Sequence, residues 1–196
     1  MARSIPSLAV IRPADGNEVV GAYIAALKRR DGPTLLALTR HNVPHIHNSS
    51  AEGVLRGAYT VHSVASPQVI LVASGSEVSV CVEAAAMLGS ANVVSMPCMS
   101  AYDEQPQEYK VSLFPAGVPV LSVEASIAMG WERYAHAHVC MGSFGASGKM
   151  GDLFQAFGFT AQNVCERAKE VVAHFGGSAP SLHSRLVFSK LVAHHH

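Results

Sequence analysis

One arginine stands where an open α/β protein would bind a ligand. Arg40 directly follows a predicted strand over residues 34–39, and ligands of open α/β sheets collect at the carboxyl ends of strands. A guanidinium there can hold two phosphate oxygens through parallel hydrogen bonds, whereas a lysine acts only as a point charge. Arg40 is therefore a candidate phosphate-binding residue. The alternative is that it fixes the following loop by donating to its carbonyl oxygens.

Two carboxylates follow other predicted strands. The segment Ser74-Gly75-Ser76-Glu77 joins a buried strand to a helix N-terminus, whose free amides favour an anion. Because Glu77 already brings a carboxylate to that end, a capping role is favoured over a ligand site. Glu124 ends a later strand and precedes Trp131 and Tyr134. It is an acid or base, a buried partner of a backbone amide, or an interface contact, and the sequence does not choose among these.

Two further motifs are weaker indications of chemistry. His41, His45 and His47 have ligand-like intervals, but they stand in a predicted loop broken by Pro44. Metal sites need a preorganised face and supporting hydrogen bonds, so surface or interface histidines are expected instead. The loop over residues 145–149 lacks the first glycine and the final hydroxyl residue of a nucleotide-binding phosphate loop. No metal ligands and no catalytic residues are predicted.

Composition limits the classes of function. The chain has 196 residues, 14 basic and 14 acidic side chains, and 49% hydrophobic residues. Zero net charge argues against a nucleic-acid or acidic-membrane binder. No apolar run approaches the roughly 18 residues of a membrane span, and no secretory signal is evident. The four cysteines are widely spaced without a C-x-x-C pair, so a reducing, cytoplasmic location is expected.

The elements that would position Arg40 form a short strand, helix and strand at residues 5–11, 19–27 and 34–38. Asp15 is the predicted N-cap of the helix, with Glu18 three residues later. Residues 41–58 are polar and without period, which is typical of a connecting loop. Two strands and one helix are too few to bury a core alone. Residues 1–58 are therefore interpreted as part of an α/β domain plus a linker.

Residues 59–176 alternate strand and helix patterns. Strands separated by helices indicate parallel βαβ units, so an α/β domain with an open, mostly parallel sheet and helices on both faces is predicted. Strands are expected at 69–73, 92–96, 118–123 and 138–141, and helices at 77–88, 107–113, 129–136, 151–157 and 161–175.

Residues 177–196 are interpreted as a tail. His194 to His196 resemble the start of a purification tag and are excluded from any metal argument. The preceding Ser189-Lys190-Leu191 matches the tripeptide that directs import into peroxisomes or the related glycosomes. The alternative is a chance match in an unstructured tail.

Seven ordered motifs resemble transketolase, a transferase. The resemblance runs from residue 3 to about 176. In chain order the motifs are Arg12-Pro-Ala-Asp-Gly-Asn-Glu18, Leu36-Ala-Leu-Thr-Arg-His-Asn42, Glu52-Gly-Val-Leu-Arg-Gly-Ala-Tyr59, Ala73-Ser-Gly-Ser-Glu-Val78, Val94-Ser-Met-Pro97, Phe144-Gly-Ala-Ser-Gly148 and Phe157-Gly-Phe-Thr160.

The resemblance implies a fold and an activity. The chain would be the last third of a pyrimidine-binding domain followed by a whole, Rossmann-like C-terminal domain. Transketolases use thiamine diphosphate and a divalent metal, Mg²⁺ or Ca²⁺, to move a two-carbon ketol unit between ketose and aldose phosphates in the pentose phosphate pathway. They are homodimers. Arg40 matches the arginine that holds the sugar phosphate in this family.

The same resemblance implies that other active-site motifs lie outside this sequence. In the family, the metal and diphosphate motif, the glutamate that activates the cofactor and the substrate-binding histidines precede the part that resembles residue 1. The chain by itself is therefore expected to be inactive and to bind no cofactor or metal. Alternatives are the equivalent domain of another thiamine diphosphate enzyme, such as deoxyxylulose-phosphate synthase or a 2-oxo acid dehydrogenase β subunit, or a non-catalytic α/β module for dimer contacts or anion binding.

Overall fold

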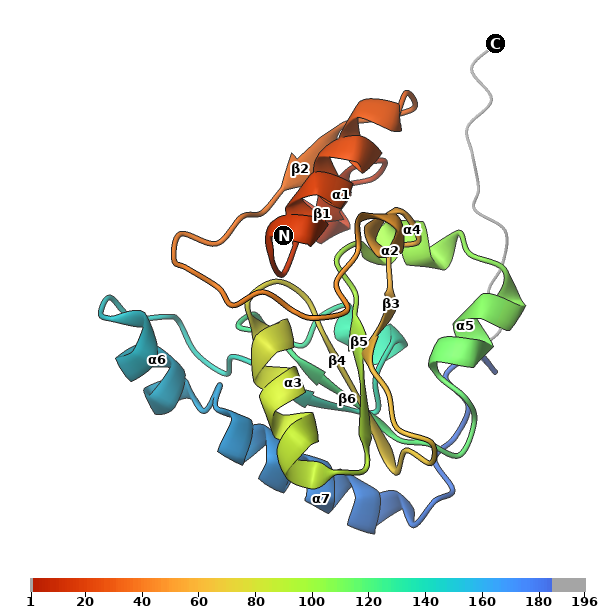
Figure 1. Ribbon diagram of the computed structural model, residues 1–196, viewed down its shortest axis with the longest axis vertical. Helices are drawn as coiled ribbons and strands as arrows, with labels where there is room; N and C mark the ends of the chain where they lie inside the picture. Colours follow the sequence, from red (N-terminus) through yellow and green to blue (C-terminus); the bar gives the residue numbers. More distant parts are fainter. Residues whose placement is uncertain (1, 185–196) are drawn as a thin grey trace.

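The first residues build a small unit of their own. The structure is a computed structural model that describes residues 2–184. A 3-10 helix, η1 (Ala2–Ser4), is followed by β1 (Ala9–Ile11), α1 (Gly16–Lys28) and β2 (Thr34–Leu36). β1 and β2 pair in parallel as a separate two-stranded sheet, with Ile11 opposite Leu36. We call β1, α1 and β2 the N-terminal unit (Figure 1).

Helix α1 begins as the sequence predicts. The carboxylate of Asp15 accepts a hydrogen bond from the backbone N–H of Glu18 at 3.1 Å, which satisfies one of the free amides of the first turn. The prediction that Asp15 is the N-cap is confirmed. The helix ends at Lys28, before the turn that leads to Pro33 and β2.

The remaining strands form one sheet. Its order is β3 (Tyr59–His62), β5 (Ala91–Ser95), β4 (Val69–Ala73), β6 (Val120–Val123) and β7 (Ala137–Val139). All neighbouring pairs are parallel except β3 with β5. Every residue of the central strand β4 is buried, which explains why its sequence is a continuous apolar run instead of an alternating one.

Helices cover both faces of this sheet. α3 (Glu77–Leu88) and α7 (Ala161–Phe175) pack on one face, where Leu71 of β4 points. α4 (Met99–Asp103), α5 (Gln107–Leu113) and η2 (Trp131–Arg133) pack on the other, where Val72 points. α6 (Met150–Phe157) lies at the edge beside α3 (Figure 1). The predicted fold class, an open, mostly parallel α/β sheet preceded by a partial α/β unit, is confirmed.

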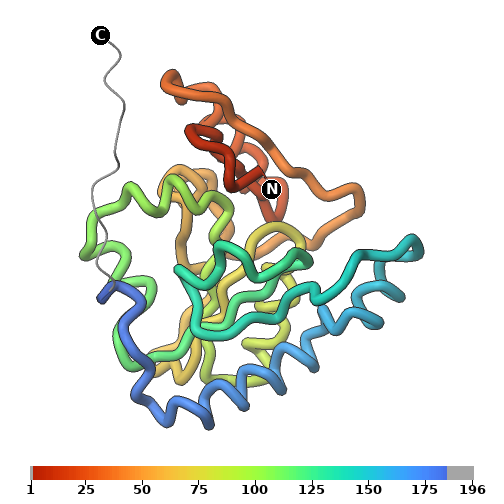
Figure 2. The backbone as a smooth tube through the Cα atoms, turned by 180° about the vertical axis from the view of Figure 1, so that it is seen from behind, coloured from red at the N-terminus to blue at the C-terminus, as the bar shows by residue number. Residues whose placement is uncertain are grey.

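The N-terminal unit shares a hydrophobic cluster with the larger domain. Ala22 of α1 and Ile11 of β1 pack with Val54 of α2 (Ala51–Leu55) and with Cys98 at the start of α4. Figure 2 shows the unit seated at one end of the larger domain. Two strands and one helix thus form a stable unit because helices outside it bury their apolar side.

Two predictions about local structure are wrong, and two elements have no counterpart among the predictions. The loop predicted over residues 41–58 contains α2, which is only five residues long and therefore too short to show a helical period. The helix predicted over 129–136 is limited to η2, because Trp131 turns inward to Glu124 after Gly130 adopts a φ of +94°. α4 and β3 were not predicted at all.

Substitution of two glycines tests the backbone conformation at the end of α3 and at the start of α6. Gly89 follows α3 with a φ of +68° and open space around its Cβ position, whereas Gly151 lies inside the first turn of α6, also in open space. We expect Gly89→Ala to lower the free energy of unfolding by about 1 kcal/mol, because a left-handed alanine is strained. Gly151→Ala is expected to raise it by up to about 0.5–1 kcal/mol. Urea unfolding of both variants measures these changes. Equal effects would contradict the left-handed conformation of Gly89 and the helical conformation of Gly151.

Candidate functional site

Arg40 lies at the mouth of a cavity. β2 ends at Leu36 and not at the predicted residue 39, so Arg40 lies in the loop beyond the carboxyl end of the small sheet. Its side chain is exposed, and it makes no hydrogen bond or ion pair with any residue in the part of the chain that the structure describes. It does not point inward to fix the loop, so the structure leaves the guanidinium free for a ligand.

The cavity measures about 850 Å³ and has two unlike walls. One wall is the segment 37–41, which carries Arg40 and the apolar Leu38. The opposite wall is α6 with the loop before it. The two walls belong to the N-terminal unit and to the larger domain. The lining also includes Arg12, Pro13, Gly75, Ser76, Glu77, Ala125, Gly148, Met150, Leu153 and Phe154.

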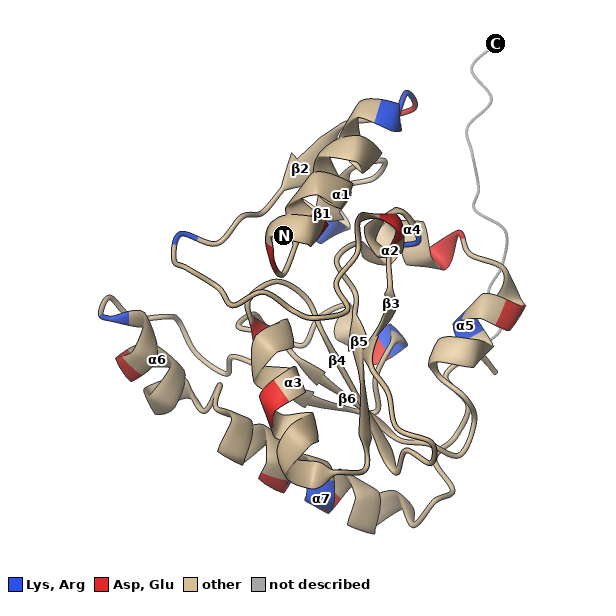
Figure 3. Ribbon diagram, in the orientation of Figure 1, with Lys and Arg blue, Asp and Glu red and all other residues tan. Residues whose placement is uncertain are grey.

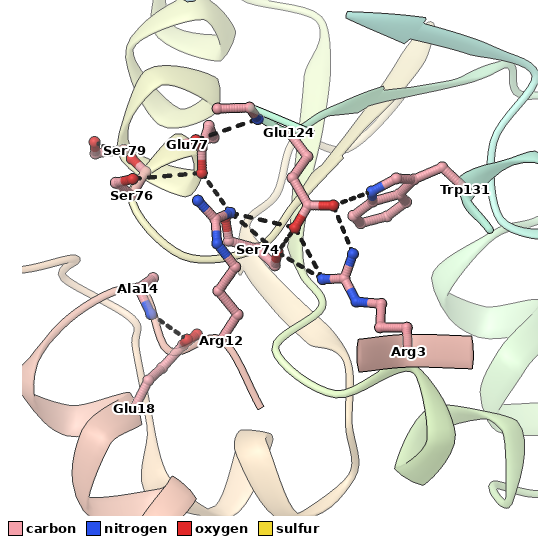
Figure 4. Close-up of polar contacts among 11 residues, drawn as sticks. Arg3, Arg12, Ala14, Glu18, Ser74, Ser76, Glu77, Ser79, Glu124 and Trp131 are labelled. Carbon is pink, nitrogen blue, oxygen red and sulfur yellow. Dashed lines mark hydrogen bonds and ion pairs between the residues drawn. The ribbon is translucent and has the colours of Figure 1, made fainter. Parts of the chain in front are cut away.

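The floor of the cavity is closed by an ion pair. A nitrogen of the Arg12 guanidinium, Nη1, lies 2.5 Å from Oε2 of Glu77 and donates to the carbonyl oxygen of Ser74 at 2.5 Å. Glu77 is 1% exposed at its side chain and also accepts from the backbone N–H of Ala125 at 3.3 Å. Figure 4 shows these contacts.

A second carboxylate continues the network away from the cavity. The carboxylate of Glu124 accepts hydrogen bonds from both terminal nitrogens of Arg3, at 2.6 and 2.8 Å. It also accepts from the indole N–H of Trp131 at 2.5 Å and from the hydroxyl of Ser74 at 2.8 Å. The nearest nitrogen of Arg12 lies 3.4 Å away. We call Arg3, Arg12, Glu77 and Glu124 the charge cluster (Figure 4).

The arginines of the charge cluster lower the pKa of Glu124. Burial alone would raise the pKa of Glu124, but the hydrogen bonds and positive charge of Arg3, with the charge of Arg12, bring the pKa below the ordinary value. For Arg12, burial works against the charged form and Glu77 outweighs it, so the pKa is raised. These shifts favour the carboxylate form of Glu124 and the cationic form of Arg12.

The partners of Glu77 and Glu124 differ from those that the sequence predicts. Glu77 does not cap α3, since Ser76 at the N-cap makes no side-chain bond to the helix and Glu77 itself binds Arg12. The favoured capping role is wrong because a distant arginine competes for the carboxylate. Glu124 is a buried partner, but its partners are arginine and tryptophan side chains instead of a backbone amide. Arg3 was missed, and no local pattern marks it.

Glu18 is the centre of a second buried hydrogen-bond network, which joins the N-terminal unit to the larger domain. Its Oε2 accepts from the backbone N–H of Ala14 at 2.7 Å, and its Oε1 accepts from the hydroxyls of Tyr59 at 2.8 Å and Ser95 at 2.5 Å. Burial raises its pKa, although these hydrogen bonds oppose the shift. Beyond supporting the N-terminus of α1, Glu18 thus joins that helix to β3 and β5.

The histidine cluster lies on the surface. His41, His45 and His47 are exposed, and one ring nitrogen of His45 lies 3.3 Å from Asp15. Within residues 2–184 no three His, Cys, Asp or Glu side chains come together as ligands for an ion. These residues alone do not fit the divalent metal that the family resemblance implies.

The surface charge is mixed. Figure 3 shows both signs along α5 and α7, in agreement with the equal totals of basic and acidic residues. None of the helices described between residues 2 and 184 combines the length and the apolar character that crossing a bilayer would need. The predicted tripeptide Ser189-Lys190-Leu191 and the histidines after it lie outside the described residues.

An open α/β domain joined to a smaller parallel unit, with an unpaired arginine beside the cavity between them, defines a class: a multidomain α/β protein with a candidate anion site beyond a strand end. The model of the transketolase-like C-terminal domain matches residues 57–160, and the model of the transketolase pyrimidine-binding domain matches residues 1–45. The chain belongs to the transketolase family.

Individual relatives agree with this assignment. Transketolase 1 of Candida albicans is 46% identical over 179 residues, which are 89% of this chain and 26% of that protein. A transketolase structure from Leishmania mexicana superposes with a TM-score of 0.91 at 46% identity, over 93% of this chain and 28% of the other. A Pichia stipitis transketolase in complex with sedoheptulose-7-phosphate gives 0.91 at 42% identity, over 95% and 28%. The chain spans about a quarter of the length of the curated relatives it matches.

Proposed function

We propose that this chain supplies the phosphate-binding arginine and the C-terminal domain of a transketolase, an enzyme that transfers a two-carbon ketol unit between sugar phosphates. The observation that carries the proposal is the unpaired Arg40 at the edge of an 850 Å³ cavity. The similar Pichia stipitis protein binds a sugar phosphate, which supports this class of ligand.

In the proposed enzyme, residues of this chain bind and orient. The guanidinium of Arg40 holds the phosphate dianion through parallel hydrogen bonds and so fixes the distal end of the sugar. Leu38, Leu153 and Phe154 reduce the water around that contact, which strengthens it. Thiamine diphosphate and a divalent metal would be held outside the described residues in the whole enzyme and would supply an electron sink there.

A second part of the proposal concerns the chain by itself. We expect it to catalyse no ketol transfer and to bind no thiamine diphosphate, because the described residues hold no metal-ligand group. The exposed Val20, Tyr23 and Leu27 of α1 form an apolar stripe, and the two-stranded sheet has open edges. We propose that the rest of a pyrimidine-binding domain packs there in the whole enzyme, which acts as a homodimer in the pentose phosphate pathway.

The binding site is tested by substitution of Arg40. We expect Arg40→Met to weaken the affinity for fructose 6-phosphate about 10- to 100-fold, because hydrogen bonds to a charged group contribute about 1.5–3 kcal/mol. NMR titration of the chain measures this through the backbone N–H signals of residues 37–41, which line the cavity and are present in wild type and variants. Arg40→Lys is expected to retain part of the affinity.

Arg167→Met is the matched control, since Arg167 is a surface arginine in an ion pair with Glu170 on α7. Unphosphorylated fructose should leave the Arg40 signals unmoved. Equal affinity of wild type and Arg40→Met would exclude Arg40 as the phosphate ligand. Shifts confined to Ser76 and Glu77 would favour instead the non-catalytic anion-binding module, against which the present engagement of Glu77 by Arg12 already argues.

The location of the protein is a separate proposal. We propose a cytoplasmic protein that is also directed to peroxisomes or glycosomes when Ser189-Lys190-Leu191 stands at its carboxyl end. A fluorescent protein fused before residue 1 of a chain ending at Leu191 should accumulate in these organelles. A cytoplasmic signal identical to that of a chain ending at Phe188 would overturn the import proposal.

A further inference from the structure

We infer that Arg12 is a positioning residue for Arg40: it fixes the carboxyl edge of the small sheet on the start of α3 and so sets the distance between the two walls of the cavity. Arg12 lines the cavity but is not itself the ligand of the phosphate. The inference rests on the proposed function of Arg40 and adds a residue to it.

The segment that carries Arg40 is tied to the strand that carries Arg12. Ile11 pairs with Leu36 in the parallel sheet, and the backbone N–H of Ala37 donates to the carbonyl oxygen of Ile11 at 2.9 Å. Arg12 is the next residue after Ile11. A shift of Arg12 therefore moves the segment that ends at Arg40.

Arg12 is in turn anchored to the larger domain at several points. Its backbone N–H donates to the carbonyl oxygen of Pro97 at 2.9 Å, and its own carbonyl oxygen accepts from the N–H of Gly75 at 3.0 Å. Its side chain lies across Gly75 to reach Glu77 and the carbonyl oxygen of Ser74. Gly75 has a φ of +62°, and a Cβ there would lie 2.7 Å from the guanidinium carbon, so only glycine leaves room for this arginine.

The charges show why Arg12 is an anchor and not a ligand. Its guanidinium faces the carboxylates of Glu77 and Glu124, which are 1% and 4% exposed at their side chains. A phosphate bound to Arg12 would leave a buried carboxylate without its cation, which is strongly unfavourable. Arg40, across the same cavity, has no such competitor.

The test compares affinities for fructose 6-phosphate, measured by NMR on the full chain. We expect Arg12→Met to lower the affinity about tenfold, since a misplacement of about 1 Å at a binding site is costly. Arg12→Lys keeps the ion pair with Glu77 and should restore most of it. Because Arg12→Met leaves the buried carboxylate of Glu77 without its cation and can prevent folding, the double variant Arg12→Met/Glu77→Met provides a neutral replacement that also lacks the anchor.

Glu77→Met separates anchor from ligand by the sign of its effect. Removing a carboxylate from the cavity should strengthen anion binding if Arg12 becomes free to hold the phosphate. Positioning predicts the opposite, a loss of affinity similar to that of Arg12→Met. Arg167→Met controls for the loss of a surface arginine. A gain of affinity in Glu77→Met would overturn the inference.

Residual dipolar couplings of α1 and α3 amides supply a readout that needs no ligand. The inference predicts a changed orientation of α1 relative to α3 in Arg12→Met and in the double variant, with wild-type couplings in Arg12→Lys. Unchanged couplings in all variants would overturn it. If the wild-type chain binds no sugar phosphate, the proposed function of Arg40 fails, and these couplings alone decide whether Arg12 positions the segment.

Discussion

Replacing Glu124 with alanine is expected to lower the free energy of unfolding by about 3 kcal/mol, because it leaves the partly buried guanidinium of Arg3 and the buried indole N–H of Trp131 without their acceptor. Arg3 donates both terminal nitrogens to this carboxylate, and Trp131 donates its indole N–H. Arg3 lies 121 positions from Glu124 in the sequence, whereas Trp131 lies 7 positions after it. Glu124→Ala should therefore loosen the contact between η1 and the larger domain as well as the packing around η2.

Urea unfolding at pH 7 measures this loss. The matched control is Glu170→Ala, which removes a carboxylate from an exposed ion pair with Arg167 on α7 and should cost at most about 0.5 kcal/mol. Glu124→Gln keeps an oxygen acceptor and should fall between the two. A loss below about 1 kcal/mol for Glu124→Ala would mean that the cluster does not depend on this charge.

The pH dependence of the Glu124 effect has a definite sign. The pKa of Glu124 is lowered in the folded chain, chiefly because Arg3 outweighs the effect of burial. The stability that it contributes is therefore present above the pKa of an unfolded glutamate, about 4.3, and is lost as the pH falls through the folded value. The difference between wild type and Glu124→Ala should shrink below about pH 4.

Much of the fold was predictable because its signals are local. The bounds of β4, α3, α5 and α7 follow from continuous apolar runs or a helical period, and the structure has them where the sequence predicts them. Asp15 could be recognised as an N-cap because its partner is three residues away. Such elements need no knowledge of the rest of the chain.

The missed elements depend on distant partners. α2 is one short turn whose apolar Val54 is buried only because α1 and α4 lie against it. η2 is shortened because Trp131 reaches the carboxylate of Glu124. In both cases tertiary contacts override a weak local pattern, which a sequence window of a dozen residues does not contain.

The site divides in the same way. Arg40 could be found from its place after a strand and from the resemblance of its motif, because both are local. The ion pairs of Arg3 and Arg12 span 121 and 112 positions to Glu124. Arginine and glutamate are common enough that no spacing rule would select these pairs.

Glu18 should give the second large loss of stability. Glu18→Ala removes the acceptor of three donors: the N–H of Ala14 and the hydroxyls of Tyr59 and Ser95. Each buried donor left without a partner costs about 1–3 kcal/mol, so a total of about 3 kcal/mol or more is expected at pH 5. The loss should also separate α1 from β3 and β5, which is visible as faster amide exchange in α1.

The contribution of Glu18 to stability should change with pH in the opposite direction to that of Glu124. Burial raises the pKa of Glu18 in the folded chain, so its contribution is full below the unfolded pKa and is lost as the pH rises through the folded value. Glu18→Gln cannot ionise, and its deficit relative to wild type should therefore decrease between about pH 4 and 7, where the deficit of Glu124→Gln increases or stays constant. Urea unfolding of both glutamine variants across this range gives the two slopes. If both deficits rise with pH, then Glu18 is held as a carboxylate by the three donors that surround it, and the burial of α1 against the sheet is not what sets its charge.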